Sequence, residues 1–172
     1  VPRGWFLPVT PGTRFVSLGG AVASDVHGKN HHCDGSFGAY VSAIQLALPG
    51  AGWVDCSPTA NPEIFWATVG GMGLTGFIGE VELQLRPIAS AYVRAQHHAA
   101  SNLDGLFDLF SDPDRDAPYT VAWIDCLSSG NKLGRGVLMT GHHAALQELP
   151  TGVRSRPYDL PAVKALSVPV NL

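Results

Sequence analysis

The sequence predicts an α+β fold in which helices cover one face of an antiparallel sheet. Strand-like stretches of short or alternating apolar residues, bounded by turn residues, recur along the chain. Two helical stretches with capping residues interrupt them, and in the second half the order is strand, helix, strand, strand. An apolar fraction of 45% with only 15% charged residues is typical of a globular chain with a buried core.

Proline and glycine govern the N-terminal elements. Residues 1–13 predict an extended segment that ends in a tight turn. Residues 14–18 predict a short strand, and residues 21–25 predict a helical turn. The N-terminus of that turn would face the glycine pair 19–20, where free N–H groups suit a phosphate or another anion.

A hairpin and a helix follow. Residues 40–48 and 53–56 predict two strands joined by the loop 49–52. Asn61 is a typical N-cap residue and Pro62 a typical first residue of a helix, which we expect to end at the next glycine pair.

Residues 77–86 alternate between apolar and polar side chains and predict a half-buried strand that Pro87 ends. Glycine-rich motifs stop here, so we place a domain boundary at this point, with residues 1–88 and 89–172 as two domains. The remaining elements that we expect are strands at 92–96, 119–126 and 136–142, a helix at 102–110 and a turn at 111–114.

Composition excludes several classes of protein. A net charge of -3 and a pI near 6.1 provide no basic field for nucleic acid. No run of about 18 apolar residues is present, which leaves only peripheral contact with a membrane. Cys33, Cys56 and Cys126 are too widely spaced for a zinc knuckle or a disulfide framework, and we expect three buried small hydrophobic side chains. Because the sequence opens without methionine and closes on scattered prolines, we expect a piece of a longer chain.

The stretch 19–32 is the strongest candidate for a functional site, because it gathers glycines, a charged pair and three histidines in one short run. Glycines allow the backbone to approach a ligand closely. Its polar side chains offer donors and acceptors that can orient a polar ligand. These side chains are Ser24, Asp25, His27, Lys29 and Asn30.

The segment 71–76 satisfies the dinucleotide-binding pattern G-x-G-x-x-G, but we reject that interpretation. The fingerprint requires a strand before the glycines and a helix after them. Here the predicted helix comes first and the predicted strand follows. A helix C-cap with a close glycine-lined crossing explains the pattern better.

His27 and His31 have the i, i+4 spacing of a helical metal pair, but Gly28 and Asn30 between them argue against a helix. We expect no metal site. His27 either faces a ligand or forms hydrogen bonds within the loop, and for His31 and His32 we favour the second interpretation. The pairs 97–98 and 142–143 lie in predicted strands, where neighbouring side chains point to opposite faces and cannot chelate together.

Four collinear segments, 8–13, 19–32, 35–38 and 65–76, together resemble the FAD-linked oxidase family of the vanillyl-alcohol-oxidase type. Within that family, the resemblance is closest to a branch that acts on a polyprenyl-phosphate ribose. Residues 8–78 carry the specific motifs. Beyond Pro87 the resemblance thins to three short stretches, which are 122–123, 132–135 and 148–150.

The resemblance implies the second half of an FAD-binding domain in residues 1–88, followed by the start of an antiparallel-sheet substrate cap in residues 89–172. The implied catalytic residues are His27 and Lys29, and Gly28, Lys29 and Trp123 would contact substrate. The implied flavin-binding residues are Gly12, Thr13, Ser17, Leu18, Gly19, Gly20, Ser24, Asp25, Val26, His27 and Ile78.

The implied reaction is oxidation of the ribose 2′-hydroxyl to a ketone, with hydride passing to flavin N5. Lys29 would interact with the phosphate and His27 with the reacting sugar. The resemblance also implies a partner, an NAD-dependent short-chain reductase that reduces the ketone, and a peripheral position at the cytoplasmic or periplasmic face of the inner membrane.

Two other functions stay open on the residues alone. An aldonolactone or alditol oxidase would share the flavin motifs but act on a soluble polyol. A non-catalytic binding module would keep the fold without the flavin. The family's pyrophosphate-binding loop and its C-terminal segment have no counterpart in these residues, so we expect the isolated chain to be inactive.

Overall fold

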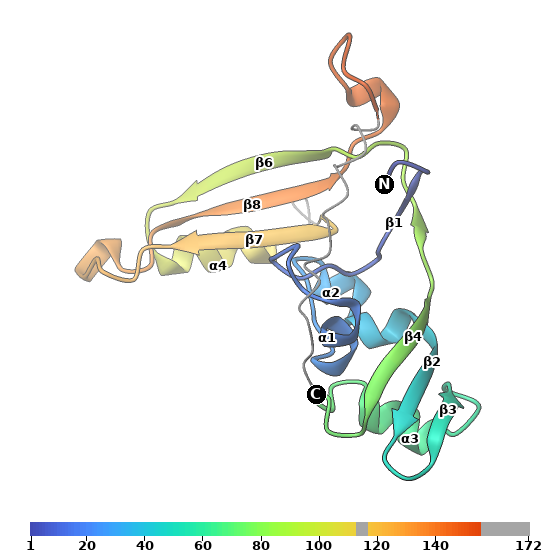
Figure 1. The fold of residues 1–172 in the computed structure, drawn as a ribbon. Coiled ribbons are helices and arrows are strands. Elements are labelled where there is room, and N and C mark those ends of the chain that lie inside the picture. The colour runs from blue at the N-terminus through green and yellow to red at the C-terminus, as the bar shows by residue number, and fades with distance from the viewer. Residues whose placement is uncertain (113–116, 156–172) are drawn as a thin grey trace, which may run out of the picture.

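A computed structural model describes residues 1–112 and 117–155 of the chain. It contains helices and antiparallel sheets, as the sequence predicts. Figure 1 shows two parts, a compact assembly of short helices with one sheet and a long second sheet that extends away from it.

The first part is built on a three-stranded sheet in the order β3-β2-β4. Strand β2 pairs with both neighbours in antiparallel fashion, and β-bulges interrupt its register with β4. The elements are α1 (Leu18–Ala23), α2 (His31–Asp34), the 3-10 helix η1 (Phe37–Tyr40), β2 (Val41–Leu48), β3 (Gly52–Cys56), α3 (Pro62–Thr68) and β4 (Phe77–Leu83).

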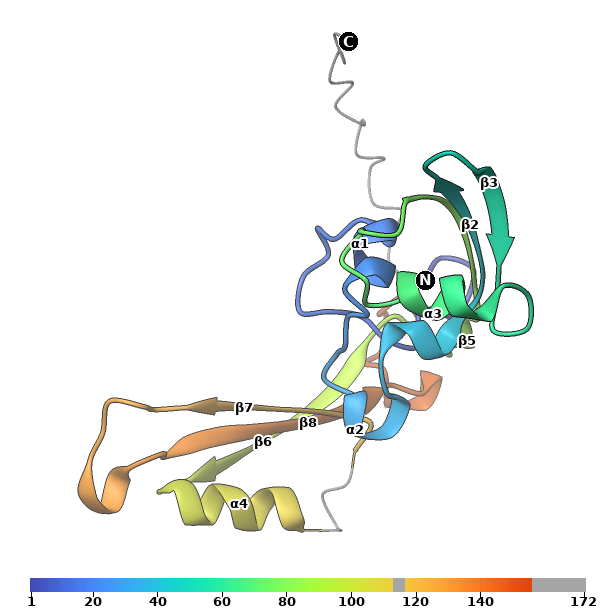
Figure 2. The ribbon, with the colours of Figure 1, turned by 90° about the horizontal axis from the view of Figure 1, so that it is seen from below.

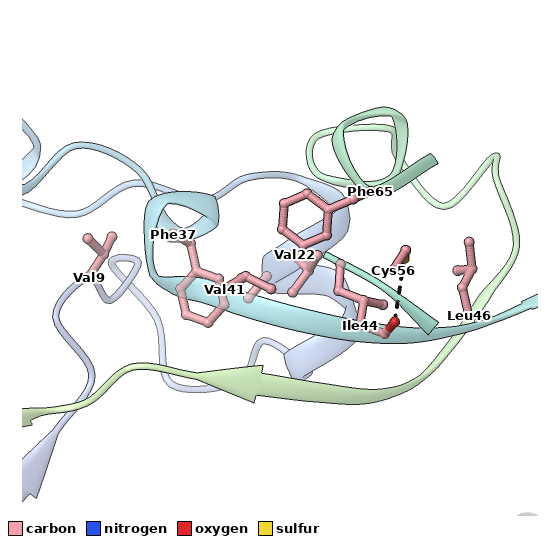
Figure 3. Packing of buried hydrophobic residues seen from close by; sticks show 9 residues of the cluster. Val9, Val22, Phe37, Val41, Ile44, Leu46, Cys56 and Phe65 are labelled. Atoms are coloured by element: carbon pink, nitrogen blue, oxygen red, sulfur yellow. Dashed lines mark hydrogen bonds between the residues drawn. The ribbon is translucent and has the colours of Figure 1, made fainter. Parts of the chain in front are cut away.

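The core of the first part lies between this sheet and the helices, as Figure 3 shows. Ile44 and Leu46 extend from β2, Val22 comes from α1, and Phe65 from α3. All four side chains are at most 1% exposed. The alternation of apolar residues along β2 therefore directs one face of the strand into the core.

The second part is the sheet β6-β8-β7 with a single helix, α4, on one of its faces (Figures 1 and 2). Ala100, Leu106 and Leu138 form its buried cluster. The elements are β6 (Val93–Ala100), α4 (Leu103–Ser111), β7 (Tyr119–Ile124), the 3-10 helix η3 (Gly130–Lys132), β8 (Gly136–His143) and the 3-10 helix η4 (Leu146–Glu148).

Backbone contacts join the two parts. Strand β1 (Trp5–Phe6) pairs with β5 (Arg86–Pro87), immediately before the chain enters the second part. The N–H of Thr120 on β7 donates to the carbonyl oxygen of Lys29 at 2.8 Å. The loop between α1 and α2 is therefore attached to the edge strand of the second sheet.

Several expectations about local elements are wrong. Residues 14–18 form no strand, because Ser17 caps α1 and the helix already begins at Leu18. Gly19 and Gly20 therefore lie inside the helix rather than before it. Pro87 lies within β5 instead of ending a strand, since β4 already stops at Leu83. The predicted turn at 111–114 falls partly outside the described residues.

Two side-chain expectations also need correction. Cys56 is buried as expected, but Cys33 and Cys126 are exposed, because they lie on the short helix α2 and beyond the end of β7. Asn61 is the N-cap residue of α3, as expected, but its side chain forms no capping hydrogen bond. Its amide donates to the carbonyl oxygen of Asp55 at 2.9 Å.

Candidate functional site

The loop between α1 and α2, residues 24–30, lies where the two parts meet. His27 forms a β-bridge with Ser36. A Cβ on Gly28 would collide with the carbonyl oxygen of Thr10, so only glycine lets these two backbone segments cross. His27 and Lys29 have exposed side chains on either side of this crossing. Gly28 is therefore needed for the close packing of two backbone segments, in addition to any role in ligand access.

Asn30 anchors the end of this loop. Its side chain is 1% exposed, and its amide nitrogen donates to the carbonyl oxygen of Pro8 at 2.7 Å and to Asp34 Oδ2 at 2.6 Å. The loop is therefore tied to residues that precede it by about twenty positions and to the helix that follows it.

Asp34 and Arg86 form a two-pronged ion pair beneath the loop. The hydrogen bonds from Arg86 are the main reason that the pKa of Asp34 lies below its usual value, while partial burial opposes that shift. The hydrogen bond with Asp34 in turn raises the pKa of Arg86. Asp34 is therefore a carboxylate at neutral pH and can only accept hydrogen bonds.

A cavity of about 640 Å³ opens on one side of the loop. His27, Gly28 and Lys29 line it together with His31 and His32. The rings of His27 and His31 lie 5.5 Å apart, and His32 Nε2 lies 3.1 Å from the carbonyl oxygen of Ala117. The rest of the lining combines the apolar residues Leu109, Phe110, Val121 and Leu138 with the polar residues Ser111, Asp112 and Thr120. The cavity thus combines charged and hydrogen-bonding side chains with an apolar patch.

A second cavity, of about 510 Å³, lies on the other side of the same loop. Gly12 and Thr13 line it with Phe6, Val16 and Lys29, among other residues. A Cβ on Gly12 would meet no atom within 4 Å, so the backbone at this position is accessible to a ligand. Lys29 lines both cavities and is the side chain best placed to interact with ligands in either.

Some of the predicted flavin-binding residues lie close together, and others already form hydrogen bonds within the chain. Gly19 lies against Ile78, whose Cβ would be 3.8 Å from a Cβ on Gly19. The Ser17 hydroxyl is used to cap α1, because it accepts from the N–H of Gly20 at 3.1 Å. The Asp25 carboxylate accepts from the N–H of Gly38 at 2.7 Å and so connects the loop after α1 to the backbone of η1. Asp25 therefore has a structural contact in addition to any contact with a ligand.

The other predicted site residues differ in exposure. Leu18 and Ser24 are exposed on α1 and its C-cap, whereas Val26 packs against the first core. Trp123 is 62% exposed on β7 and does not line either cavity. Its neighbour Ala122 packs on the cluster beneath α4, so Trp123 belongs to the opposite face of the sheet.

Sequence reasoning missed Tyr119, Phe110 and the Asp34–Arg86 pair. Tyr119 lines the second cavity, and its hydroxyl lies 3.2 Å from His143 Nε2. Asp34 and Arg86 are 52 positions apart in sequence. Arg86 was expected on the polar side of a predicted strand, and that position does not indicate an ion-pair partner. No local pattern would have identified these residues.

No group of three or more metal-binding side chains with metal-site geometry occurs in residues 1–112 and 117–155. Over the same part of the chain, no helix combines the length and the apolar character that crossing a bilayer requires.

Comparison with known proteins confirms the resemblance to the FAD-linked oxidase family, and the chain is related to oxidoreductases. It is 40% identical to decaprenylphosphoryl-beta-D-ribose oxidase of Mycolicibacterium smegmatis over 172 residues, which cover 98% of this chain and 37% of that protein. An uncharacterised protein encoded in the mprA 5′ region of Streptomyces coelicolor is 40% identical over 157 residues, 91% of this chain and 42% of that protein.

A more distant relative is the Delta(24)-sterol reductase of Rattus norvegicus, 28% identical over 108 residues, 63% of this chain and 21% of that protein. No family model matches the chain. The chain spans less than half the length of these relatives.

Proposed function

We propose that this chain forms part of an FAD-dependent sugar oxidase that converts the 2′-hydroxyl of a decaprenylphosphoryl ribose to a ketone. The observation that carries the proposal is the cavity beside His27, Gly28 and Lys29, with its apolar patch of Leu109, Phe110, Val121 and Leu138. The similarity to decaprenylphosphoryl-beta-D-ribose oxidase over nearly the whole chain supports the same substrate class.

The residues of the second cavity suit a flavin. Cofactor sites are mostly apolar concavities with a few convergent polar groups, and Phe6, Val16, Gly12 and Thr13 supply both kinds of surface. These residues, together with the neighbouring Gly19 and Ile78, would hold the flavin. When bound, FAD would supply the hydride acceptor for the oxidation.

The loop residues would hold the sugar at the border of the two cavities beside Lys29, because hydride transfer requires the sugar carbon to contact the flavin. The ammonium group of Lys29 would neutralise the phosphate, since charge-assisted hydrogen bonds to phosphate are among the stronger polar contacts. A ring nitrogen of His27 would hydrogen-bond the sugar hydroxyl and accept its proton as the C–H hydride leaves. The apolar patch at Leu109 and Phe110 would accommodate the first isoprene units.

This assignment extends to the organisation of the chain. We propose that residues 1–88 contribute to the flavin-binding domain and residues 89–172 to the substrate cap. The ketone product would require a separate NAD-dependent reductase to complete an epimerisation. A peripheral position at the inner membrane follows from a lipid-linked substrate.

The test is the visible absorption spectrum of the purified gene product before and after anaerobic addition of farnesyl-phosphoryl ribose. Flavin bands that bleach on addition are the expected result. Flavin bands that persist, but bleach with xylitol or an aldonolactone, would move the assignment to a polyol or lactone oxidase. A protein without flavin bands, and without flavin release on denaturation, would overturn the enzyme assignment.

A further inference from the structure

We propose that Asn30 is a positioning residue for the loop that presents His27 and Lys29, and that Asp34, anchored by Arg86, sets the orientation of its amide together with the Pro8 carbonyl. The inference rests on the proposed function, because it assumes that this loop contacts the ligand. It concerns the residues that hold the loop rather than those that face the ligand.

Asn30 is one of the points at which the loop is fixed to the first part of the molecule, beside the His27–Ser36 bridge and the Asp25–Gly38 hydrogen bond. It follows Lys29 directly, is 1% exposed, and donates from one amide nitrogen to Pro8 and to Asp34. The backbone carbonyl of Asn30 also accepts from the N–H of Asp34 at 2.8 Å. A displacement of Asn30 would therefore move Lys29 relative to the backbone of residues 8–10.

Two acceptors determine which way the amide faces. Because the Asp34 carboxylate and the Pro8 carbonyl oxygen only accept, the NH₂ group of Asn30 has to face them, and the amide oxygen has to face away. That oxygen is buried without a hydrogen-bond partner among the described residues, next to Gly28. Burying an acceptor without a hydrogen bond has a free-energy cost.

This cost points to a functional role. Buried polar side-chain atoms in folded proteins usually have a hydrogen-bond partner, so this oxygen is an exception that calls for an explanation. Conflicts between local satisfaction and the fold concentrate at functional sites. Asn30 lies one residue from Lys29, which lines both cavities, so the unsatisfied amide lies at the proposed site.

The positioned group is the Lys29 backbone together with its side chain. The Lys29 carbonyl accepts from the N–H of Thr120 on β7, so a loop held by Asn30 also holds the border between the two cavities. Binding groups act efficiently only when packing and hydrogen bonds around them fix their geometry. Asn30 would provide that support from the first part of the molecule.

The experiment substitutes Asn30→Leu in the gene product, with Thr68→Val as the matched control. Thr68 is also fully buried and donates to the carbonyl oxygen of Ile64 at 2.7 Å, but it lies on α3 and lines neither cavity. Three quantities are measured: the affinity for farnesyl phosphate, the hydrogen exchange rate of the Thr120 amide, and the melting temperature.

For Asn30→Leu we expect roughly tenfold or more weaker binding and at least roughly tenfold faster exchange at Thr120. The melting temperature should also fall, because the Pro8 carbonyl and the Asp34 carboxylate each lose a hydrogen bond. The control should change neither binding nor exchange at Thr120. If Asn30→Leu does not fold, Asp34→Asn serves instead, because it leaves the size of the site intact and weakens the hydrogen bond that ties Asn30 to α2. That variant should give the same two changes at smaller amplitude.

The outcomes separate the two proposals. Unchanged exchange at Thr120 in a folded Asn30 or Asp34 variant would overturn the positioning role. Equal changes in the Thr68→Val control would show a merely structural effect and would overturn it as well. Failure of the parent protein to bind farnesyl phosphate would count against the proposed substrate class, while the exchange measurement would still decide the role of Asn30.

Discussion

The two parts of the molecule bury their apolar side chains in different ways. In the described residues, the first part gathers nine buried residues from several helices and a sheet, whereas the second part has a cluster of three beneath one helix. The first part can therefore hold a loop rigidly, and the second leaves one sheet face open. The candidate site lies where the rigid part meets the open one.

The largest effect should come from the first core. Phe65→Ala removes a ring that is 0% exposed and leaves a cavity between α3 and β2, so we expect a loss of about 3–5 kcal/mol in the free energy of unfolding. Denaturant unfolding measures it. The neighbouring Trp66 is 53% exposed, and Trp66→Ala is the control. Similar losses for both variants would contradict the assignment of this core.

Truncation in the second cluster should lower the free energy of unfolding by a smaller amount. Leu106 is 2% exposed, but few buried residues surround it, so the site can relax after truncation. We expect Leu106→Ala to cost about 2 kcal/mol, near the low end for buried leucines. Phe107→Ala, at a position 61% exposed, is the control in the same unfolding experiment. A loss as large as that of Phe65→Ala would remove the contrast between the two parts.

The crossing at Gly28 tests the contact between the loop and the N-terminal segment. An alanine here would press on the Thr10 carbonyl and lie 2.8 Å from Asn30 Oδ1, so we expect about 1–3 kcal/mol of destabilisation together with weaker farnesyl phosphate binding. Gly12→Ala, where no atom lies within 4 Å, should leave stability unchanged. Stability that is equal in both variants would show that the backbone can separate at the crossing without cost.

Acidification should affect the two parts in different pH windows. Burial, followed by the charges of Arg86 and His142, lowers the pKa of His143 in the second part below its ordinary value of 6.5. The unfolded chain therefore takes up a proton first, and stability falls as the pH drops below about 6.5. Asp34 in the first part has a pKa below its ordinary 3.8, so its contribution persists until the pH falls below about 4.

Thermal unfolding of the parent, His143→Leu and Asp34→Asn between pH 7.5 and 3 measures both effects. The His143 variant should lose the decline that begins below about pH 6.5 and keep the decline near pH 4 and below. The Asp34 variant should behave in the opposite way. An unchanged pH profile in both variants would show that these two side chains do not account for the pH dependence.

Local patterns in the sequence were sufficient for most of the elements. The alternation along 77–83, the hairpin at 41–56 and the helix after Asn61 depend on residues close in sequence, and the structure contains all three. The strand expected at 14–18 is wrong because the Ser17 hydroxyl starts a helix there. The hydrogen bond from the Gly20 N–H to the Ser17 hydroxyl thus favours a helix start over the strand that the apolar residues predicted.

The candidate site was predicted as a set of residues but not as a geometry. Composition singled out His27, Gly28 and Lys29, and the structure places all three on one cavity. Composition did not single out Arg86, because one arginine on the polar side of a predicted strand does not indicate a functional site. Asp25 was expected to face a ligand, yet its carboxylate also holds the Gly38 backbone.

The sequence by itself determined the mixed architecture, the glycine-rich site loop and the family resemblance, since each depends on residue types at short spacing. Only the tertiary structure decided that Asn30, Asp34 and Arg86 support this loop and that Lys29 lies between two cavities. The physical reason is that hydrogen bonds and cavities arise between segments far apart in the chain. Their partners are chosen by packing, which no local pattern records.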